Sequence, residues 1–353
     1  MEVLLFDKQK YETLYNCSFY DIEKIPVESR RHPYWGVFFL SLYSTFFFLY
    51  IVCIIAMLTI EQRKQASYQF MILLGCSHLI GLQTSGLMVG IGTLRGIVFC
   101  SPNTSTIVYF AGCTATGAWI ASTSTSQILG INRCLVLYKR HLAETIFGGW
   151  CIILWMCIPL LLAFYMFTFT VPPIFTSILM SYLYNPHFGY FQDLGERYKS
   201  VPHATNNLFV CCTESLIYAM LIFLYLRATR SASNEVRTAV HRDKRIYIQV
   251  VLVGLIHFIA SLSYVLIQFL EFFQNEYFIV ITSTFYLLSQ GAPPLIYISV
   301  NPTLRTHILR ICLMAKTFIT RGTWPITLSQ ENIITPSIQT NSGVRNSFNS
   351  GTL

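Results

Sequence analysis

The sequence predicts an all-α membrane protein: a seven-transmembrane-helix bundle with a short amphipathic eighth helix. Three observations indicate this class. Of the 353 residues, 54% are hydrophobic and 11% are charged, whereas soluble domains carry roughly 25% charged residues. Seven apolar runs are each long enough to cross a bilayer, which takes about 20 residues. The basic residues gather between these runs, as is typical of membrane topology.

The chain divides into four predicted segments. Residues 1–33 form a polar extracellular tail, and residues 34–300 form the seven-helix domain. In residues 301–320, apolar and basic side chains occupy opposite faces of a helix, which indicates a helix on the membrane surface. Residues 321–353 are rich in Ser and Thr and poor in apolar residues, so we expect a disordered cytoplasmic tail. The apolar runs cover residues 34–60, 68–94, 104–138, 146–170, 208–228, 246–272 and 277–300.

The distribution of charge orients the bundle. With the N-terminus outside, the inner segments carry 16 of the 24 Lys and Arg residues, and the outer segments carry 8. Because cytoplasmic segments are enriched in positive charge, we expect an extracellular N-terminus. Arg30 and Arg31, next to the first run, locally favour the opposite orientation. The sequons at Asn16 and Asn103 both fall outside, so we expect both to be glycosylated.

The third apolar run carries a polar stripe that ends on an arginine. Its members are spaced at i, i+4, i+7, i+11 and i+14 and therefore share one helix face; they are Trp119, Thr123, Ser126, Gly130 and Arg133. A charge inside an apolar helix is expensive and usually functional. The alternative is an arginine that anchors the helix at the interface, below a seam of small packing residues.

Several classes of function are disfavoured. The basic residues do not cluster on a soluble face, which nucleic-acid binding requires. The eleven cysteines show no CxxC and no metal-ligand spacing, and His78 and His257 stand alone in different predicted helices. We therefore expect no metal, no cofactor and no enzyme activity. The alternative membrane class, a transporter of small solutes, predicts repeats with matched interrupted helices, and we find neither.

Several features resemble the G-protein-coupled receptors over residues 34–316. The third run ends in Asn132-Arg133-Cys134, the seventh contains Pro294-x-x-Tyr297, and Leu304-Arg305 follows. The rhodopsin-like pattern has an acidic residue where Asn132 stands, so the resting partner of Arg133 is not implied. The resemblance implies that the residues that couple to a heterotrimeric G protein are Asn132, Arg133, Tyr297 and Arg305.

A set of short motifs resembles the nematode serpentine chemoreceptors, and within them class T. In chain order, these motifs are Tyr15-Asn16-Cys17-Ser18, Leu49-Tyr50-Ile51-x-Cys53, Leu74-Gly75-Cys76, Cys100-x-x-x-x-Ser105, Ile131-Asn132-Arg133-Cys134 and Ile296-Tyr297. The resemblance implies a receptor for odorants or other small molecules. It also implies a place in the plasma membrane of sensory neurons, with their cilia as the expected site.

The outer half of the predicted bundle holds the candidate ligand residues. They are Thr116, Trp119, Glu214, Gln268, Tyr286 and Gln290. Few polar groups among many apolar ones are typical of small-molecule sites. Glu214 is the one acidic residue well inside an apolar run. It either contacts a ligand, or it is protonated and bonded to a neighbouring helix.

The cysteines and the tail carry the remaining expectations. Cys17 and Cys100 both fall outside, where disulfides persist, so we expect them to pair. Two free thiols, or a bridge that uses Cys211, are the alternatives. Residues 171–207, the longest mid-chain loop, contain no cysteine. Cys312 on the amphipathic helix is a candidate for palmitoylation, and the Ser/Thr-rich tail is a candidate for phosphorylation and arrestin binding.

Overall fold

The computed structural model describes residues 1–18, 20–193, 197–231, 234–270 and 275–321. It separates into two units, Met1–Ile308 and Leu309–Leu353. Along the chain the elements are α1 (Glu2–Phe6), α2 (Lys8–Leu14), η1 (Ile22–Lys24), α3 (Val27–Arg30), α4 (Pro33–Thr59), η2 (Glu61–Lys64), α5 (Ala66–Leu82), η3 (Gln83–Met88), α6 (Val89–Arg95), α7 (Ser105–Tyr138), α8 (Arg140–Phe147), α9 (Cys151–Phe169), β1 (Ile174–Thr176), β2 (Ser181–Leu183), α10 (Val201–Ser231), α11 (Asn234–Phe269), α12 (Glu276–Gly291), α13 (Pro293–Val300) and α14 (Pro302–Arg321).

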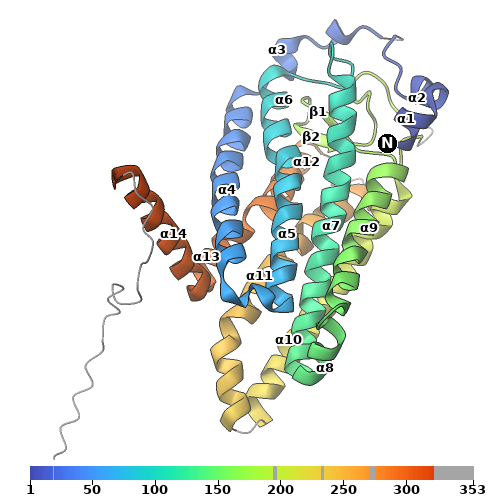
Figure 1. Ribbon diagram of the computed structural model, residues 1–353. Coiled ribbons are helices and arrows are strands. Elements are labelled where there is room, and N and C mark those ends of the chain that lie inside the picture. Colours follow the sequence, from blue (N-terminus) through green and yellow to red (C-terminus); the bar gives the residue numbers. More distant parts are fainter. Residues whose placement is uncertain (19, 194–196, 232–233, 271–274, 322–353) are drawn as a thin grey trace, which may run out of the picture. The chain divides into compact units, whose positions relative to one another are not determined.

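The first unit is the predicted helix bundle. Among the described residues, five helices are long and apolar enough to cross a membrane, and α12 with α13, bent by 47°, makes a sixth span. The seventh, α7, is 34 residues long but richer in Ser and Thr. It packs against α5, α9, α10 and α11, so neighbouring helices rather than lipid cover its polar stripe. Figure 1 shows α7 between α5 and α9.

Two spans are interrupted, one by a π-helical turn and the other at a proline. One π-helical turn, η3, joins α5 to α6, and such turns leave backbone carbonyls free for other partners. The carbonyl of Thr84 accepts a hydrogen bond from the Tyr182 hydroxyl of β2 at 3.2 Å. The span that α12 and α13 form breaks where Pro293 begins α13, because proline cannot donate the backbone hydrogen bond of a helix interior.

The sequence analysis expected a loop over residues 171–207, but the structure shows a β-hairpin and the start of α10 in this range. β1 pairs antiparallel with β2, with Ile174 opposite Leu183, and α10 begins seven residues earlier than predicted. The first turns of α10 carry polar side chains, which disguised the helix in the hydrophobicity pattern. Asn207 in this stretch is fully buried and accepts a hydrogen bond from the Trp119 indole at 2.8 Å.

The predicted N-terminal tail contains short helices. Its short helices α1, α2 and α3 lie at the end of the bundle that carries β1 and β2 (Figure 1). Tyr15 is 5% exposed and packs edge-on against Tyr109 of α7, with ring centroids 5.0 Å apart. Residues 1–18 and 20–31 therefore form a cap, which we call the N-terminal cap.

The amphipathic eighth helix is present as α14. Asn301 begins it, and the Oδ1 atom of Asn301 accepts a hydrogen bond from the backbone N–H of Leu304 at 3.1 Å. Leu304 and Ile308 are buried within the first unit. In the second unit, the residues that follow expose Leu309, Leu313, Phe318 and Ile319. The tail beyond Arg321, for which we expected disorder, lies outside the described residues.

Candidate functional site

A small cavity lies in the half of the bundle nearer the N-terminal cap, and we call it the outer pocket. Its volume is about 40 Å³, which holds about three water molecules. Aromatic side chains from α7, β2, α10, α11 and α12, with residues next to the strands, form most of its wall. The lining residues are Ala115, Thr116, Trp119, Pro173, Tyr182, Tyr184, His203, Tyr264 and Tyr286.

Most polar hydrogens of this wall are already used within the protein. The Trp119 indole N–H donates to Asn207, and the Tyr286 hydroxyl donates to the Ala115 carbonyl at 3.1 Å. The Thr116 hydroxyl donates to the carbonyl of Gly112 at 3.1 Å. These bonds hold the aromatic rings in place, because buried polar groups that lose their partners carry a large free-energy penalty.

The structure divides the six predicted ligand residues into two groups. Thr116, Trp119 and Tyr286 line the outer pocket, whereas Glu214, Gln268 and Gln290 are absent from its wall. Gln290 is fully buried, with its amide beside the Ser289 hydroxyl at 3.4 Å. Helix spacing indicates a shared face only within one helix, so it could not show which residues of different helices meet.

Six lining residues were missed by the sequence analysis. Four of them, Pro173, Tyr182, Tyr184 and His203, belong to the stretch expected to be a loop. Aromatic residues and a histidine beside the start of an apolar run were the available signal. Without the hairpin, their direction toward the bundle was not apparent.

A chain of buried polar side chains lies beside the outer pocket. The Tyr50 hydroxyl is 2.6 Å from Nδ1 of His78, and Nε2 of His78 is 3.0 Å from Nε2 of His257. On the other side of the His257 ring, Nδ1 of His257 lies 3.9 Å from Oε1 of Glu214. All four side chains have no exposed surface. The ring of Trp119 contacts that of His257 edge-on at 6.0 Å, which connects the pocket to this chain.

The expectation that His78 and His257 stand alone was therefore wrong. They are 179 residues apart in sequence, on α5 and α11, and only the packing of those helices brings them together. One ring must donate its Nε2–H to the other. Among the described residues, no group of three or more His, Cys, Asp or Glu is arranged to hold a metal ion.

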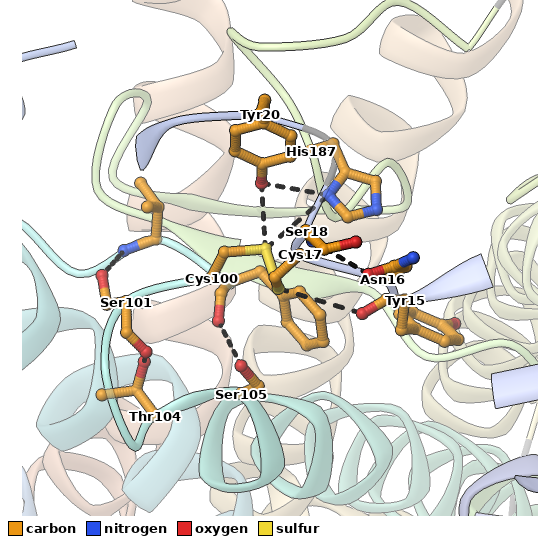
Figure 2. The surroundings of a disulfide bond; sticks show 12 residues. Tyr15, Asn16, Cys17, Ser18, Tyr20, Cys100, Ser101, Thr104, Ser105 and His187 are labelled. Carbon is orange, nitrogen blue, oxygen red and sulfur yellow. Dashed lines mark hydrogen bonds between the residues drawn. A yellow bond between two sulfur atoms is a disulfide. The ribbon is translucent and has the colours of Figure 1, made fainter. Parts of the chain in front are cut away.

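The N-terminal cap is tied to the bundle by a disulfide. Cys17 and Cys100 are joined, with their Cα atoms 5.5 Å apart, which is the pairing expected from the sequence. Figure 2 shows Tyr20 and His187 beside it. The Tyr20 hydroxyl is 3.0 Å from both Sγ of Cys100 and Nδ1 of His187. Nε2 of the same imidazole is 3.2 Å from the carbonyl of Leu14.

His187 is a buried connection between the cap and the segment after β2. Its side chain is 1% exposed, and burial lowers its pKa from 6.5, while the bond to the Leu14 carbonyl opposes this shift. Burial also raises the pKa of the Tyr20 hydroxyl. At neutral pH the imidazole is therefore neutral and donates through Nε2, and its Nδ1 accepts from the tyrosine.

The arginines next to the first span belong to the cap. Arg30 is 1% exposed; it pairs with Glu23 at 3.2 Å and donates to the carbonyl of Gly96 at 3.4 Å. Arg31 donates to the carbonyl of Leu94 at 3.0 Å. These two charges thus hold the cap against the end of α6, which explains their presence beside the first span.

The opposite end of the bundle contains a much larger cavity of about 570 Å³, which we call the inner cavity. Asn132 and Arg133 line it together with Lys64, Arg140 and Glu144. Arg133 is 7% exposed. The Oδ1 atom of Asn132 accepts a hydrogen bond from the hydroxyl of Ser67 on α5 at 3.2 Å.

The other two predicted coupling residues lie elsewhere. Tyr297 of α13 is 1% exposed, and its hydroxyl has no hydrogen-bond partner among the described residues. Arg305 is exposed on the first turn of α14. Neither lines the inner cavity, so the structure places only Asn132 and Arg133 of the four in one site.

The predicted glycosylation and palmitoylation sites are accessible. Asn16 and Asn103 are exposed; Asn16 lies next to the disulfide (Figure 2), and Asn103 adopts a positive φ of 58°, which asparagine tolerates better than most residues. Cys312 is exposed on α14. Exposure is required for modification but does not by itself establish it.

Comparisons with known proteins place the chain in a family. A family model, described as the serpentine type 7TM GPCR chemoreceptor Srt, matches residues 1–321. Serpentine receptor class T-55 of Caenorhabditis elegans is 26% identical over 318 residues, which cover 86% of this chain and 82% of the relative. The family is one of chemoreceptors rather than enzymes. With its apolar helices, the chain is a multi-pass membrane protein with a receptor role, and it belongs to the Srt family of serpentine seven-transmembrane chemoreceptors.

Proposed function

We propose that this receptor binds a small molecule in the outer pocket and activates a heterotrimeric G protein through the inner cavity. One observation carries the proposal. A single helix, α7, contributes Thr116 and Trp119 to the pocket and Asn132 and Arg133 to the inner cavity. A change in the packing of α7 therefore acts on both sites at once.

The proposed mechanism is a shift between two populations of the bundle. The pocket is smaller than most organic ligands, so a ligand favours a state in which the surrounding rings move apart. Trp119 contacts His257 of α11 and Tyr286 of α12, with ring centroids 6.0 Å and 5.8 Å apart. Displacement of this indole acts on both helices. Movement of α10 and α11 at the other end then uncovers Arg133 for the G protein.

We place the receptor in the plasma membrane of sensory neurons, in their cilia. In the proposed topology, the N-terminal cap lies outside the cell. The charge distribution supports this orientation, as does the clustering of Asn16, Asn103 and the disulfide at one end. We expect glycosidase treatment to shift the wild-type mobility and to leave an Asn16→Gln/Asn103→Gln variant unchanged. An extracellular C-terminal tag would contradict the orientation.

Two features outside the bundle belong to the same proposal. Palmitoylation of Cys312 would add an anchor to α14, since a buried acyl chain contributes membrane affinity. Phosphorylation of the Ser/Thr-rich tail would provide acceptors for arrestin, although that tail lies outside the described residues. Both are expectations from the sequence, and the exposed position of the thiol is compatible with the first.

The test uses two arginines of the inner cavity. Arg133→Ala should abolish ligand-evoked nucleotide exchange on a co-expressed G protein while surface expression stays normal, because a buried charge at this depth is expected to be functional. Arg140→Ala is the matched control, since Arg140 lines the same cavity but is exposed and paired with Glu144 at 3.1 Å. Wild-type coupling in the Arg133 variant would refute the proposal.

A further inference from the structure

The outer pocket has a wall without ionised side chains. None of its nine lining residues is Asp, Glu, Lys or Arg. A charged ligand in this cavity would lose its hydration without gaining an opposite charge among the lining residues, and such burial is strongly unfavourable. If the pocket is the ligand site, as proposed above, its ligand is uncharged.

One hydrogen-bond donor of the wall can be assigned from its neighbours. The Trp119 indole N–H can only donate, and it donates to Asn207 at 2.8 Å, so the amide atom it contacts must be the oxygen. The amide nitrogen of Asn207 therefore faces Nδ1 of His203 at 3.4 Å. An amide nitrogen also only donates, so Nδ1 accepts, and the single proton of the neutral imidazole sits on Nε2.

The backbone and the rings around this imidazole hold it in place. The Ser261 hydroxyl of α11 donates to the carbonyl of Asn207 at 2.8 Å, which fixes that turn of α10. His203 sits between two tyrosines of the pocket wall, with ring centroids 5.6 Å from Tyr184 and 6.2 Å from Tyr264. The Trp119 indole and the hydroxyls of Thr116, Tyr182 and Tyr286 all donate to other groups of the protein, whereas Nε2–H of His203 makes no hydrogen bond within the described residues. The buried hydroxyl of Tyr184 also has no partner there, but a hydroxyl can donate or accept, whereas Nε2–H can only donate.

We infer that His203 is the specificity-determining residue of the outer pocket, and that its Nε2–H donates a hydrogen bond to an acceptor atom on a small, uncharged organic ligand. The apolar body of the ligand then packs against the aromatic wall. Ketones, aldehydes, esters and ethers have the required acceptor. The inference rests on the proposed function of the pocket, but it makes no assumption about G-protein coupling.

The test measures ligand binding to the purified, full-length receptor by thermal stabilisation, from which dissociation constants follow. The probes are dialkyl ketones, with alkanes, alkylamines and alkyl carboxylates of the same chain length as matched sets. We expect ketones to raise the melting temperature of the wild type, while the amines and carboxylates have no effect. His203→Phe should weaken ketone binding about tenfold and leave alkane binding unchanged.

Two further substitutions separate donation from packing. His203→Gln places an amide N–H near the position of Nε2 and should retain ketone binding. His203→Asn reaches only the position of Nδ1 and should behave as His203→Phe does. Thr205→Ala, an exposed site two residues further along α10, is the control and should match the wild type.

Several results would overturn the inference. They are stabilisation by amines or carboxylates, an equal loss of ketone and alkane binding in His203→Phe, or no stabilisation by any ketone. Because melting requires no G protein, ketone binding without nucleotide exchange would refute the coupling proposal and leave the ligand class intact. Nucleotide exchange driven by a charged compound would refute the ligand class and leave the coupling proposal intact.

Discussion

The cavities at the two ends of α7 differ in size and in the charge of their walls. The outer pocket holds about 40 Å³ and lies beneath the hairpin and the disulfide-bonded cap. The inner cavity holds about 570 Å³, and Lys64, Arg133, Arg140 and Glu144 are charged residues in its wall. In the proposed function, the small outer pocket binds a small uncharged molecule, whereas the large polar inner cavity receives a segment of the G protein. Substitutions at the outer end should therefore affect folding stability more than substitutions at the inner end.

The largest effect is expected from removing the disulfide. Replacing Cys17 and Cys100 together by Ser should lower the free energy of unfolding by about 2–4 kcal/mol, because the bridge constrains the unfolded chain. Thermal unfolding followed by circular dichroism would measure the loss. Cys76→Ser, which alters an exposed free thiol, is the matched control. Equal melting temperatures for the two variants would mean that the cap adds little to the outer end.

A smaller effect should distinguish two glycines of the same helix. A Cβ atom at Gly112 would collide with the carbonyl oxygen of Pro173, which is backbone, whereas one at Gly130 would meet the Ile217 side chain at 2.6 Å. We expect Gly112→Ala to destabilise the protein by about 1–3 kcal/mol. Gly130→Ala should cost less, because the clash there is with a side-chain methyl rather than with backbone and because alanine favours helix by about 1 kcal/mol. The reverse order would show that the inner end is the more rigid one.

The smallest effect is a pH dependence at His187. Burial lowers its pKa from 6.5, so folding favours the neutral ring. Its stabilising contribution is fully present above pH 6.5 and is lost as the pH falls from 6.5 through the lowered pKa. The loss is limited, because the Tyr20 hydroxyl can turn from Nδ1 to Cys100 Sγ, which is equally close.

The measurement compares thermal unfolding of the wild type and of His187→Gln between about pH 7.5 and 5. Glutamine can still donate to the Leu14 carbonyl but does not titrate. We expect the wild type to lose more stability than the variant over this interval. Parallel curves would place the acid sensitivity of the protein at other groups.

The spans and their order were largely predictable, because they depend on local composition. Residues 68–94 were expected as one span and form α5, η3 and α6. The pairing of Cys17 with Cys100 was also expected, from their predicted side of the membrane. Where polar side chains face the bundle, as at the start of α10, the hydrophobicity pattern failed and Val201 was assigned to a loop.

The candidate site was predicted less well than the fold. Thr116, Trp119 and Tyr286 were identified because they carry polar groups in the outer half of the predicted bundle. His203 was missed. Glu214 was expected either to contact a ligand or to bond to a neighbouring helix, and it lies beside His257 of α11. Which residues of α10 line the pocket depends on the depth and rotation of α10 relative to α7 and α11. The residue pattern within one helix does not determine either.

The sequence by itself determined seven apolar spans, the stripe on α7 and the family, since each is a property of residues close in the chain or of their order along it. Tertiary structure decided which polar groups meet. It joined His78 to His257 across 179 residues, and it set Trp119, Asn207 and His203 in one hydrogen-bonded row. The physical reason is that a hydrogen bond requires atoms to approach within about 3 Å, and only the packing of helices determines which distant side chains do so.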